Sequence, residues 1–170
     1  YIFFKINSLT IIIRSYTFGD NESSKVMLDQ NKKRIFELPK IEYTLRTIKS
    51  IITSSDEALN HFKGLKLKII ITDDKSSNEN LLRIQKLLEK TNIDTQLINL
   101  DENEFLNQIN SKDINGKDIS PNMISNMRNI LKSIKISEEL DSDLFYFLED
   151  DYLHTKNAIT EILFTYEKLS

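Results

Sequence analysis

Acidic side chains follow two apolar runs in this chain, at the points where each run ends. Glu149, Asp150 and Asp151 come directly after Phe147-Leu148, and Asp73 and Asp74 follow an isoleucine run, separated from it by Thr72. Neighbouring carboxylates repel one another unless a cation or a proton lies between them. A hard ion such as Mg²⁺ or Mn²⁺ accepts one or two such oxygens and keeps other positions open for diphosphate oxygens. These residues therefore indicate a site for a divalent cation and a diphosphate.

Each acidic group also has a purely structural interpretation. The first group can form an acidic turn before a helix that begins near Thr155. The second can be a turn followed by a helix cap at Ser76, Ser77 or Asn78. Two acidic groups at the ends of two strands of one sheet favour ligand binding, because the carboxyl ends of the strands line the crevice of an open α/β sheet.

Further polar residues are expected near the same edge. Ser15 follows the first apolar run, within Arg14-Ser15-Tyr16. Arg128 precedes the acidic strand, where it either reaches a phosphate, orients Asp73, or forms an ordinary surface salt bridge. His154, three residues after Asp151, is either a ligand or a surface histidine, and the second alternative is favoured.

Short apolar runs and helical patterns alternate along the sequence and would position these residues. Near-continuous apolar runs are typical of parallel strands that are covered on both faces. The predicted strands are Leu9–Ile13, Leu67–Ile71, Gln96–Leu100 and Leu144–Leu148. The predicted helices are Glu42–Ser54, Asn78–Lys90, Ser125–Ile136 and Lys156–Leu169. The alternation predicts an α/β fold with a Rossmann-like, mostly parallel sheet and helices on both faces.

Two long connections and one clear amphipathic pattern complete this organisation. Phe18 to Lys40 and Leu100 to Asn122 are too long for simple connections, so each is expected to be a functional or a mobile loop. Between the second connection and the last strand, apolar residues recur at helical spacing and predict an apolar helix face. They are Met123, Met127, Ile130, Leu131 and Ile134.

Composition excludes several classes of function. The 170 residues carry a formal net charge of −3, which offers no electrostatic footprint for nucleic acid or an anionic membrane. The chain has no Cys, which excludes disulfides, thiolate zinc sites and a cysteine nucleophile. No apolar run approaches the roughly 20 residues of a membrane span. Neither a Gly-rich dinucleotide loop nor a P-loop is present in the sequence.

In their order along the chain, four segments resemble the nucleotide-sugar half of family-two-like glycosyltransferases of the A fold. They are Leu9 to Tyr16, Ile70 to Ser77, Met127-Arg128-Asn129 and Phe147 to Asp151. The helix pattern of that family, Leu-x-x-Ile-x-Ser, is matched by Leu45 to Ser50. The resemblance covers nearly the whole chain, and its motifs are moderately specific only in combination. It implies a single nucleotide-sugar-binding domain, residues 1–170, without the acceptor-binding half or the usual catalytic base.

The resemblance also assigns roles to individual residues. Ser15 and Asp73 would face the nucleoside, with Asp74 beside them, and Arg128 would support the base or a phosphate. Asp150 would lie near the ribose. Asp151 and Glu149 would take the outer positions of the Asp-x-Asp motif and hold Mn²⁺ or Mg²⁺.

Three features depart from the family pattern. Glu149 stands where the first Asp is usual, Arg14 stands where Pro is common, and the segment from Phe18 to Lys40 is longer than the usual first loop. The resemblance implies sugar transfer from a nucleotide-diphosphate donor to an unknown sugar, lipid or protein acceptor, as in synthesis of a cell-envelope polysaccharide. It implies a cytoplasmic location, either free or peripheral at the inner membrane face. A catalytically silent binding module and a sugar nucleotidyltransferase are the alternatives.

Overall fold

The computed structural model describes residues 5–17, 38–112 and 114–169, and these form one parallel sheet covered by helices. The sheet has four strands in the order β3-β2-β1-β4, and every pairing in it is parallel. The strands are β1 (Ser8–Ser15), β2 (Lys66–Asp73), β3 (Asp94–Asn99) and β4 (Leu144–Glu149). Because β1 pairs with both β2 and β4, the carboxyl ends of these three strands lie side by side.

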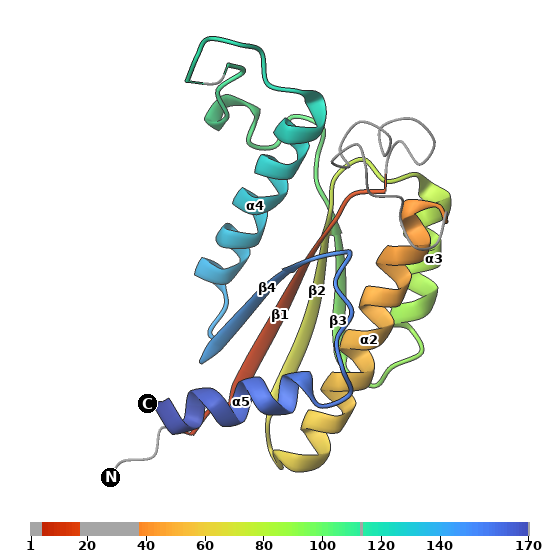
Figure 1. The fold of residues 1–170 in the computed structure, drawn as a ribbon, viewed down its shortest axis with the longest axis vertical. Helices are drawn as coiled ribbons and strands as arrows, with labels where there is room; N and C mark the ends of the chain where they lie inside the picture. Colours follow the sequence, from red (N-terminus) through yellow and green to blue (C-terminus); the bar gives the residue numbers. More distant parts are fainter. Residues whose placement is uncertain (1–4, 18–37, 113, 170) are drawn as a thin grey trace, which may run out of the picture.

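Helices cover both faces of the sheet, and the two faces are covered unequally (Figure 1). One face carries α2 (Lys40–His61), α3 (Asn78–Leu88) and α5 (Ala158–Leu169). The other face carries α4 (Pro121–Glu139), which packs on β1 and β2. A short 3₁₀ helix, η1 (Leu106–Gln108), lies in the connection between β3 and α4.

Strand residues alternate between two hydrophobic clusters, one on each face. Ile11, Ile13 and Ile69 pack with α2, α3 and α5 in the larger cluster, whereas Ile12 and Ile70 pack with α4 in the smaller one. Both sets of side chains are buried, so the middle parts of β1 and β2 are apolar on both faces. This is the physical reason why they read as continuous apolar runs.

The predicted fold class is confirmed, and all eight predicted strands and helices are present with shifted ends. α2 begins at Lys40, two residues earlier than predicted, and reaches His61. Lys40, assigned in the sequence to the first long connection, is therefore the first residue of a helix. Residues 18–37 of that connection lie outside the described residues.

The amphipathic pattern of α4 has the opposite orientation to that expected of a core-facing helix. Ser125, Arg128, Asn129 and Ser133 are buried against the sheet, although they are polar. The apolar stripe is exposed, with fractions of 37–50% for Met123, Met127, Ile130 and Ile134. The period of the pattern was therefore predicted correctly, but the side that faces the core was not.

Among the described residues, no helix is both long enough and apolar enough to span a bilayer.

Candidate functional site at the carboxyl ends of β1, β2 and β4

The strand order places a topological switch point beside β1. From β1 the chain proceeds outward through β2 to β3, and α4 then returns it to β4 on the other side of β1. The connection through α2 thus leads to one side of β1, and the connection through α4 leads to its other side. The two helices pass over opposite faces of the sheet. In open α/β sheets, ligands bind outside the carboxyl ends of the strands at such a switch point. Both predicted acidic groups lie at this edge.

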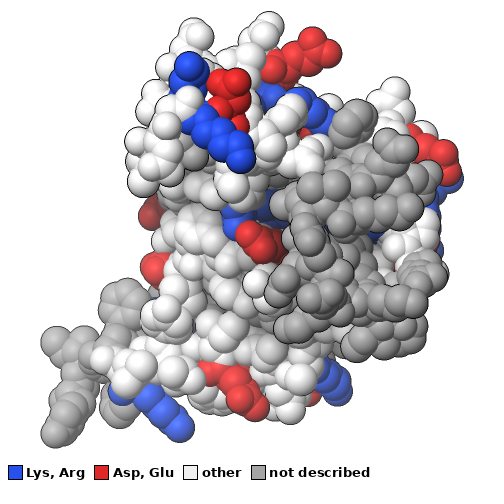
Figure 2. All heavy atoms as spheres, turned by 45° about the horizontal axis from the view of Figure 1, so that its top comes forward, with Lys and Arg blue, Asp and Glu red and all other residues white. Residues whose placement is uncertain are grey.

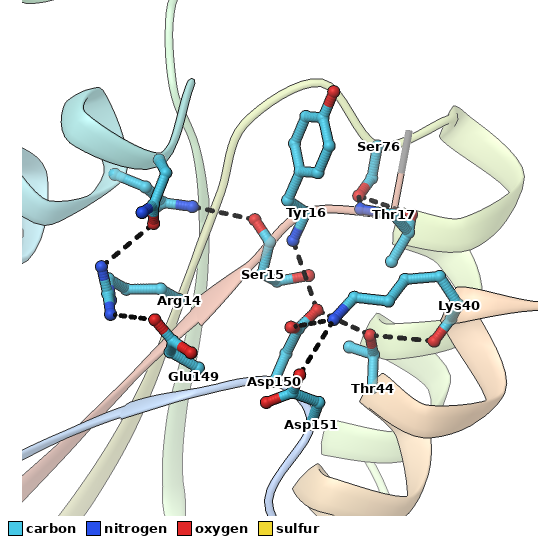
Figure 3. Close-up of polar contacts among 12 residues, drawn as sticks. Arg14, Ser15, Tyr16, Thr17, Lys40, Thr44, Ser76, Glu149, Asp150 and Asp151 are labelled. Carbon is cyan, nitrogen blue, oxygen red and sulfur yellow. Dashed lines mark hydrogen bonds and ion pairs between the residues drawn. The ribbon is translucent and has the colours of Figure 1, made fainter. Parts of the chain in front are cut away.

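Asp150 follows β4 and is held by the first turn of α2 (Figure 3). The Lys40 ammonium lies 2.7 Å from Oδ1 of Asp150, and the Thr44 hydroxyl donates to Oδ2 at 2.7 Å. The backbone N–H of Tyr16, just beyond β1, donates to the same Oδ2 at 3.3 Å. This buried carboxylate therefore joins β1, β4 and α2 at the edge of the sheet.

The two predicted metal ligands make different contacts. Glu149 accepts a charged hydrogen bond from Arg14 at 2.8 Å, and Arg14 in turn donates to Asn126 of α4 at 3.1 Å. Asp151 is half exposed, and its Oδ2 lies 4.0 Å from the Lys40 ammonium on the α2 side. Glu149 is thus engaged on the α4 side of the sheet, and Asp151 is the more accessible of the acids that follow β4.

Asp73 ends β2 and is fully buried. Its carboxylate accepts hydrogen bonds from the Ser76 backbone N–H at 3.0 Å and from the Ser76 hydroxyl at 2.6 Å. Burial raises the pKa of Asp73, and the charge of Asp150 raises it further, against the hydrogen bonds from Ser76, which lower it. The influence of Asp150 on Asp73 means that acids from β4 and β2 share one electrostatic environment.

Asp74 and Arg128 form a buried ion pair between β2 and α4. The Nη1 of Arg128 lies 3.0 and 3.1 Å from the two Asp74 oxygens, and the Ser125 hydroxyl donates to Oδ2 at 2.6 Å. Arg128 also donates to the backbone carbonyls of Asp101 and Glu104. The expectation that Arg128 orients Asp73 is wrong. Successive residues of an extended strand point to opposite faces, and Asp74 is the one that points to α4.

Two polar atoms beside these groups are buried without a hydrogen-bond partner. Asn129 donates through its Nδ2 to the Ser15 carbonyl at 2.8 Å, but its Oδ1 accepts nothing. The Ser15 hydroxyl lies close enough to Asp73 to lower the pKa of that carboxyl, yet it makes no hydrogen bond of acceptable geometry. Such atoms are costly to bury, so they mark a place where a further polar partner would be stabilising.

Tyr16 connects the two sides of the edge. Its hydroxyl donates to Asn122 of α4 at 2.7 Å, while its backbone N–H is bound by Asp150. Burial raises the pKa of the Tyr16 hydroxyl, and the negative charge of Asp74 adds to this effect.

Acidic and basic side chains are interspersed over this face rather than gathered in one patch (Figure 2).

In the described part of the chain, no three His, Asp or Glu side chains lie close enough to hold a metal ion by themselves. Mg²⁺ is commonly held by one or two carboxylates together with substrate phosphates and water. Asp151, half exposed at this edge of the sheet, fits the role of such a single carboxylate ligand. Asp150 does so less well, because its oxygens already accept three hydrogen bonds.

Sequence reasoning missed Lys40 and Thr44, which contact Asp150. Their spacing of four residues places them on one side of a helix. This signal was hidden because the residue before α2 is Pro39, which provides no side-chain cap from which the start of the helix could be recognised.

His154 is not at the site: its Nε2 pairs with the Tyr146 hydroxyl at 2.8 Å, and its backbone N–H donates to Ser50.

No protein-family model and no curated protein matches the chain. Two solved structures do, both of S. aureus TarS, a glycosyltransferase. The first matches with a TM-score of 0.53 at 10% identity and covers 95% of this chain and 20% of the TarS chain. The second, of TarS residues 1–349, matches with a TM-score of 0.51 at 12% identity and covers 95% of this chain and 32% of the other. The chain thus has a glycosyltransferase-like fold and spans less than a third of each TarS chain.

Proposed function

We propose that the chain binds a nucleoside-diphosphate sugar and forms the donor-binding part of a glycosyltransferase. The observation that carries this proposal is the convergence of acids from β2 and β4 on the end of β1, at the switch point of a glycosyltransferase-like sheet. Crevices at such points accept nucleotides in open α/β sheets. The acceptor is a sugar, lipid or protein that the site does not identify.

Different residues are assigned different parts in donor binding. Asp73 and Ser15 are proposed to lie toward the nucleoside, where the unpartnered Ser15 hydroxyl is available to a polar group of the ligand. Asp74 and Arg128 are assigned an indirect part, because their charged groups already bind each other and the backbone. They hold the loop after β3 and the helix α4 against the edge of the sheet.

The diphosphate is assigned to the end of β4, close to Asp150 and Asp151. A Mn²⁺ or Mg²⁺ ion bound there would neutralise the charge that develops on the leaving diphosphate. Asp151 is proposed as the protein ligand of that ion, with Glu149 as a more distant acid on the α4 side. Asp150, buried against α2, keeps the end of β1 and the start of α2 in place.

Calorimetric titration tests this function directly. UDP, GDP and dTDP are titrated into the chain with Mn²⁺, with Mg²⁺ and with EDTA. We expect one nucleoside diphosphate to bind, and we expect Asp151→Ala to weaken its Mn²⁺-dependent binding by about ten-fold or more, about 1.4 kcal/mol. A nucleoside monophosphate should bind more weakly, because it lacks the second phosphate.

Asp141→Ala provides the matched control. Asp141 is exposed and lies just before β4, at the opposite end of that strand, so the variant removes the same charge away from the site. Its affinity for the nucleotide should stay within two-fold of that of the unmodified chain. The proposal is rejected if no nucleoside diphosphate binds under any of the three conditions, or if Asp151→Ala and Asp141→Ala behave alike.

A further inference from the structure

A lysine occupies the acidic site at the end of β4. Lys40 lies 2.7 Å from Asp150 and 4.0 Å from Asp151, so its ammonium is between the two carboxylates on the α2 side. The sequence showed that these acids need a cation or a proton between them. The structure supplies a cation from the protein itself.

The burial of the three side chains suggests more than a structural ion pair. The side chain of Asp150 is 7% exposed, that of Lys40 is 20% exposed and that of Asp151 is 49% exposed. The ammonium therefore lies between a buried acid and an acid at the surface, and it is itself partly exposed.

Figure 3 shows the Lys40 ammonium reaching the carboxylates of Asp150 and Asp151 from the first turn of α2. A partly exposed ammonium in this position is suited to an anionic ligand with several oxygen atoms. A lysine ammonium binds phosphate oxygens as a compact point charge with three donors.

We propose that Lys40 is a diphosphate-binding residue that provides the positive charge of this site without a metal ion. It rests on the proposed function, and it adds that nucleoside-diphosphate binding persists when divalent cations are removed. Lys40 and a divalent ion then compete for Asp150 and Asp151. Loss of the lysine should weaken metal-free nucleotide binding and strengthen metal binding.

These opposite effects are measured on Lys40→Met. Titration with UDP or GDP in EDTA should show binding to the unmodified chain and at least ten-fold weaker binding to the variant. Titration with Mn²⁺ alone, followed by electron paramagnetic resonance of the free ion, should show several-fold tighter binding to the variant. A change that merely damaged the fold would weaken both kinds of binding, so the opposite signs identify the role of the lysine.

Two further variants keep the test decisive. Lys49→Met removes an exposed lysine from the same helix, and both affinities should stay within two-fold of those of the unmodified chain. If Lys40→Met fails to fold because Asp150 is left buried without its cation, the pair Lys40→Met with Asp150→Asn removes both charges. That double variant should fold and should still lack metal-free nucleotide binding.

The outcomes separate this inference from the proposed function. If a nucleoside diphosphate binds only with Mn²⁺, and equally well to Lys40→Met, the role of Lys40 is rejected and donor binding stands. The role of Lys40 is also rejected if the variant binds both Mn²⁺ and nucleotide more weakly than the unmodified chain. If no nucleoside diphosphate binds with or without metal, the donor function and the role of Lys40 in it are both rejected.

Discussion

At the scale of single residues, Asp74 and Arg128 form the most deeply buried ion pair of the site. Both side chains are almost completely inaccessible. Moving two charges out of water is costly, and only good geometry with additional hydrogen bonds offsets that cost. Arg128 meets this condition because its other donors bind the carbonyls of Asp101 and Glu104. The pair therefore fixes the connection after β3 relative to the end of β2.

Breaking this pair should destabilise the whole chain. Asp74→Asn leaves the Arg128 guanidinium buried without its carboxylate, which we expect to lower the free energy of unfolding by about 3 kcal/mol. Arg128→Met should have a similar effect for the converse reason. The double variant should cost less than the sum of the two, because neither residue then leaves an unpaired charge. Urea unfolding followed by circular dichroism measures all three values.

The surface pair of Lys68 and Asp94 is the control for this prediction. It has a similar separation, 3.1 Å, but its side chains are 29% and 66% exposed. Asp94→Asn should therefore lower the free energy of unfolding by less than about 1 kcal/mol. Equal effects of Asp74→Asn and Asp94→Asn would show that burial of the Asp74–Arg128 pair has been misjudged.

At the scale of elements, α4 is unusual because its polar side is buried. The buried residues have particular tasks: Ser125 and Arg128 hold Asp74, and Asn129 holds the Ser15 carbonyl. A helix that packs beside a polar site must present polar groups to it. The apolar residues of the same helix are consequently left on the outer side.

Substitutions on the two sides of α4 should therefore have unequal effects. Ile130→Gln, on the exposed stripe, should change the free energy of unfolding by no more than about 0.5 kcal/mol. Ser133→Leu, on the buried side, should lower it by about 2 kcal/mol, because a larger side chain must enter a packed region between α4 and β2. Urea unfolding of the two variants measures the difference. A larger loss from Ile130→Gln than from Ser133→Leu would contradict the orientation of the helix.

The orientation of α4 illustrates what the sequence can and cannot predict. β1 and β2 were predictable because burial on both faces makes their middle positions apolar. The helices were predictable because their apolar residues repeat with the period of a helix. A period does not say which side of a helix meets the sheet when the sheet offers a polar partner such as Asp74. Lys40 was missed because its role depends on a tertiary contact with Asp150, and a local sequence pattern does not predict such a contact.

At the scale of the whole molecule, the order of the strands brings the predicted site residues to one edge. Asp73 and Asp150 are 77 positions apart in the sequence, but the strands before them both pair with β1. Two strand spacings, roughly 10 Å, separate the ends of β2 and β4. A nucleoside diphosphate is long enough to extend across this distance.

The pH dependence of stability also depends on the whole molecule, because the buried Asp73 and the partly buried His154 act with opposite signs. Burial raises the pKa of Asp73 above the 3.8 of an ordinary Asp, so the folded state binds this proton more tightly than the unfolded state does. Its contribution to stability is present below pH 3.8 and is lost as the pH rises through the folded-state pKa. Burial lowers the pKa of His154 below 6.5. The contribution of this group to stability is therefore present above pH 6.5 and is lost as the pH falls through the folded-state pKa.

His154 ties three parts of the fold together, and its titration should be visible in the stability of the whole chain. It pairs with Tyr146 of β4 and Ser50 of α2 in the segment that leads into α5. Because the unfolded chain protonates this histidine first, the free energy of unfolding should fall as the pH decreases from 6.5 through the folded-state pKa. His154→Gln should flatten the slope below pH 6.5, as measured by urea unfolding at a series of pH values. His61→Gln removes an exposed histidine from the end of α2 as the control, and an unchanged slope in His154→Gln would show that His154 does not carry the effect.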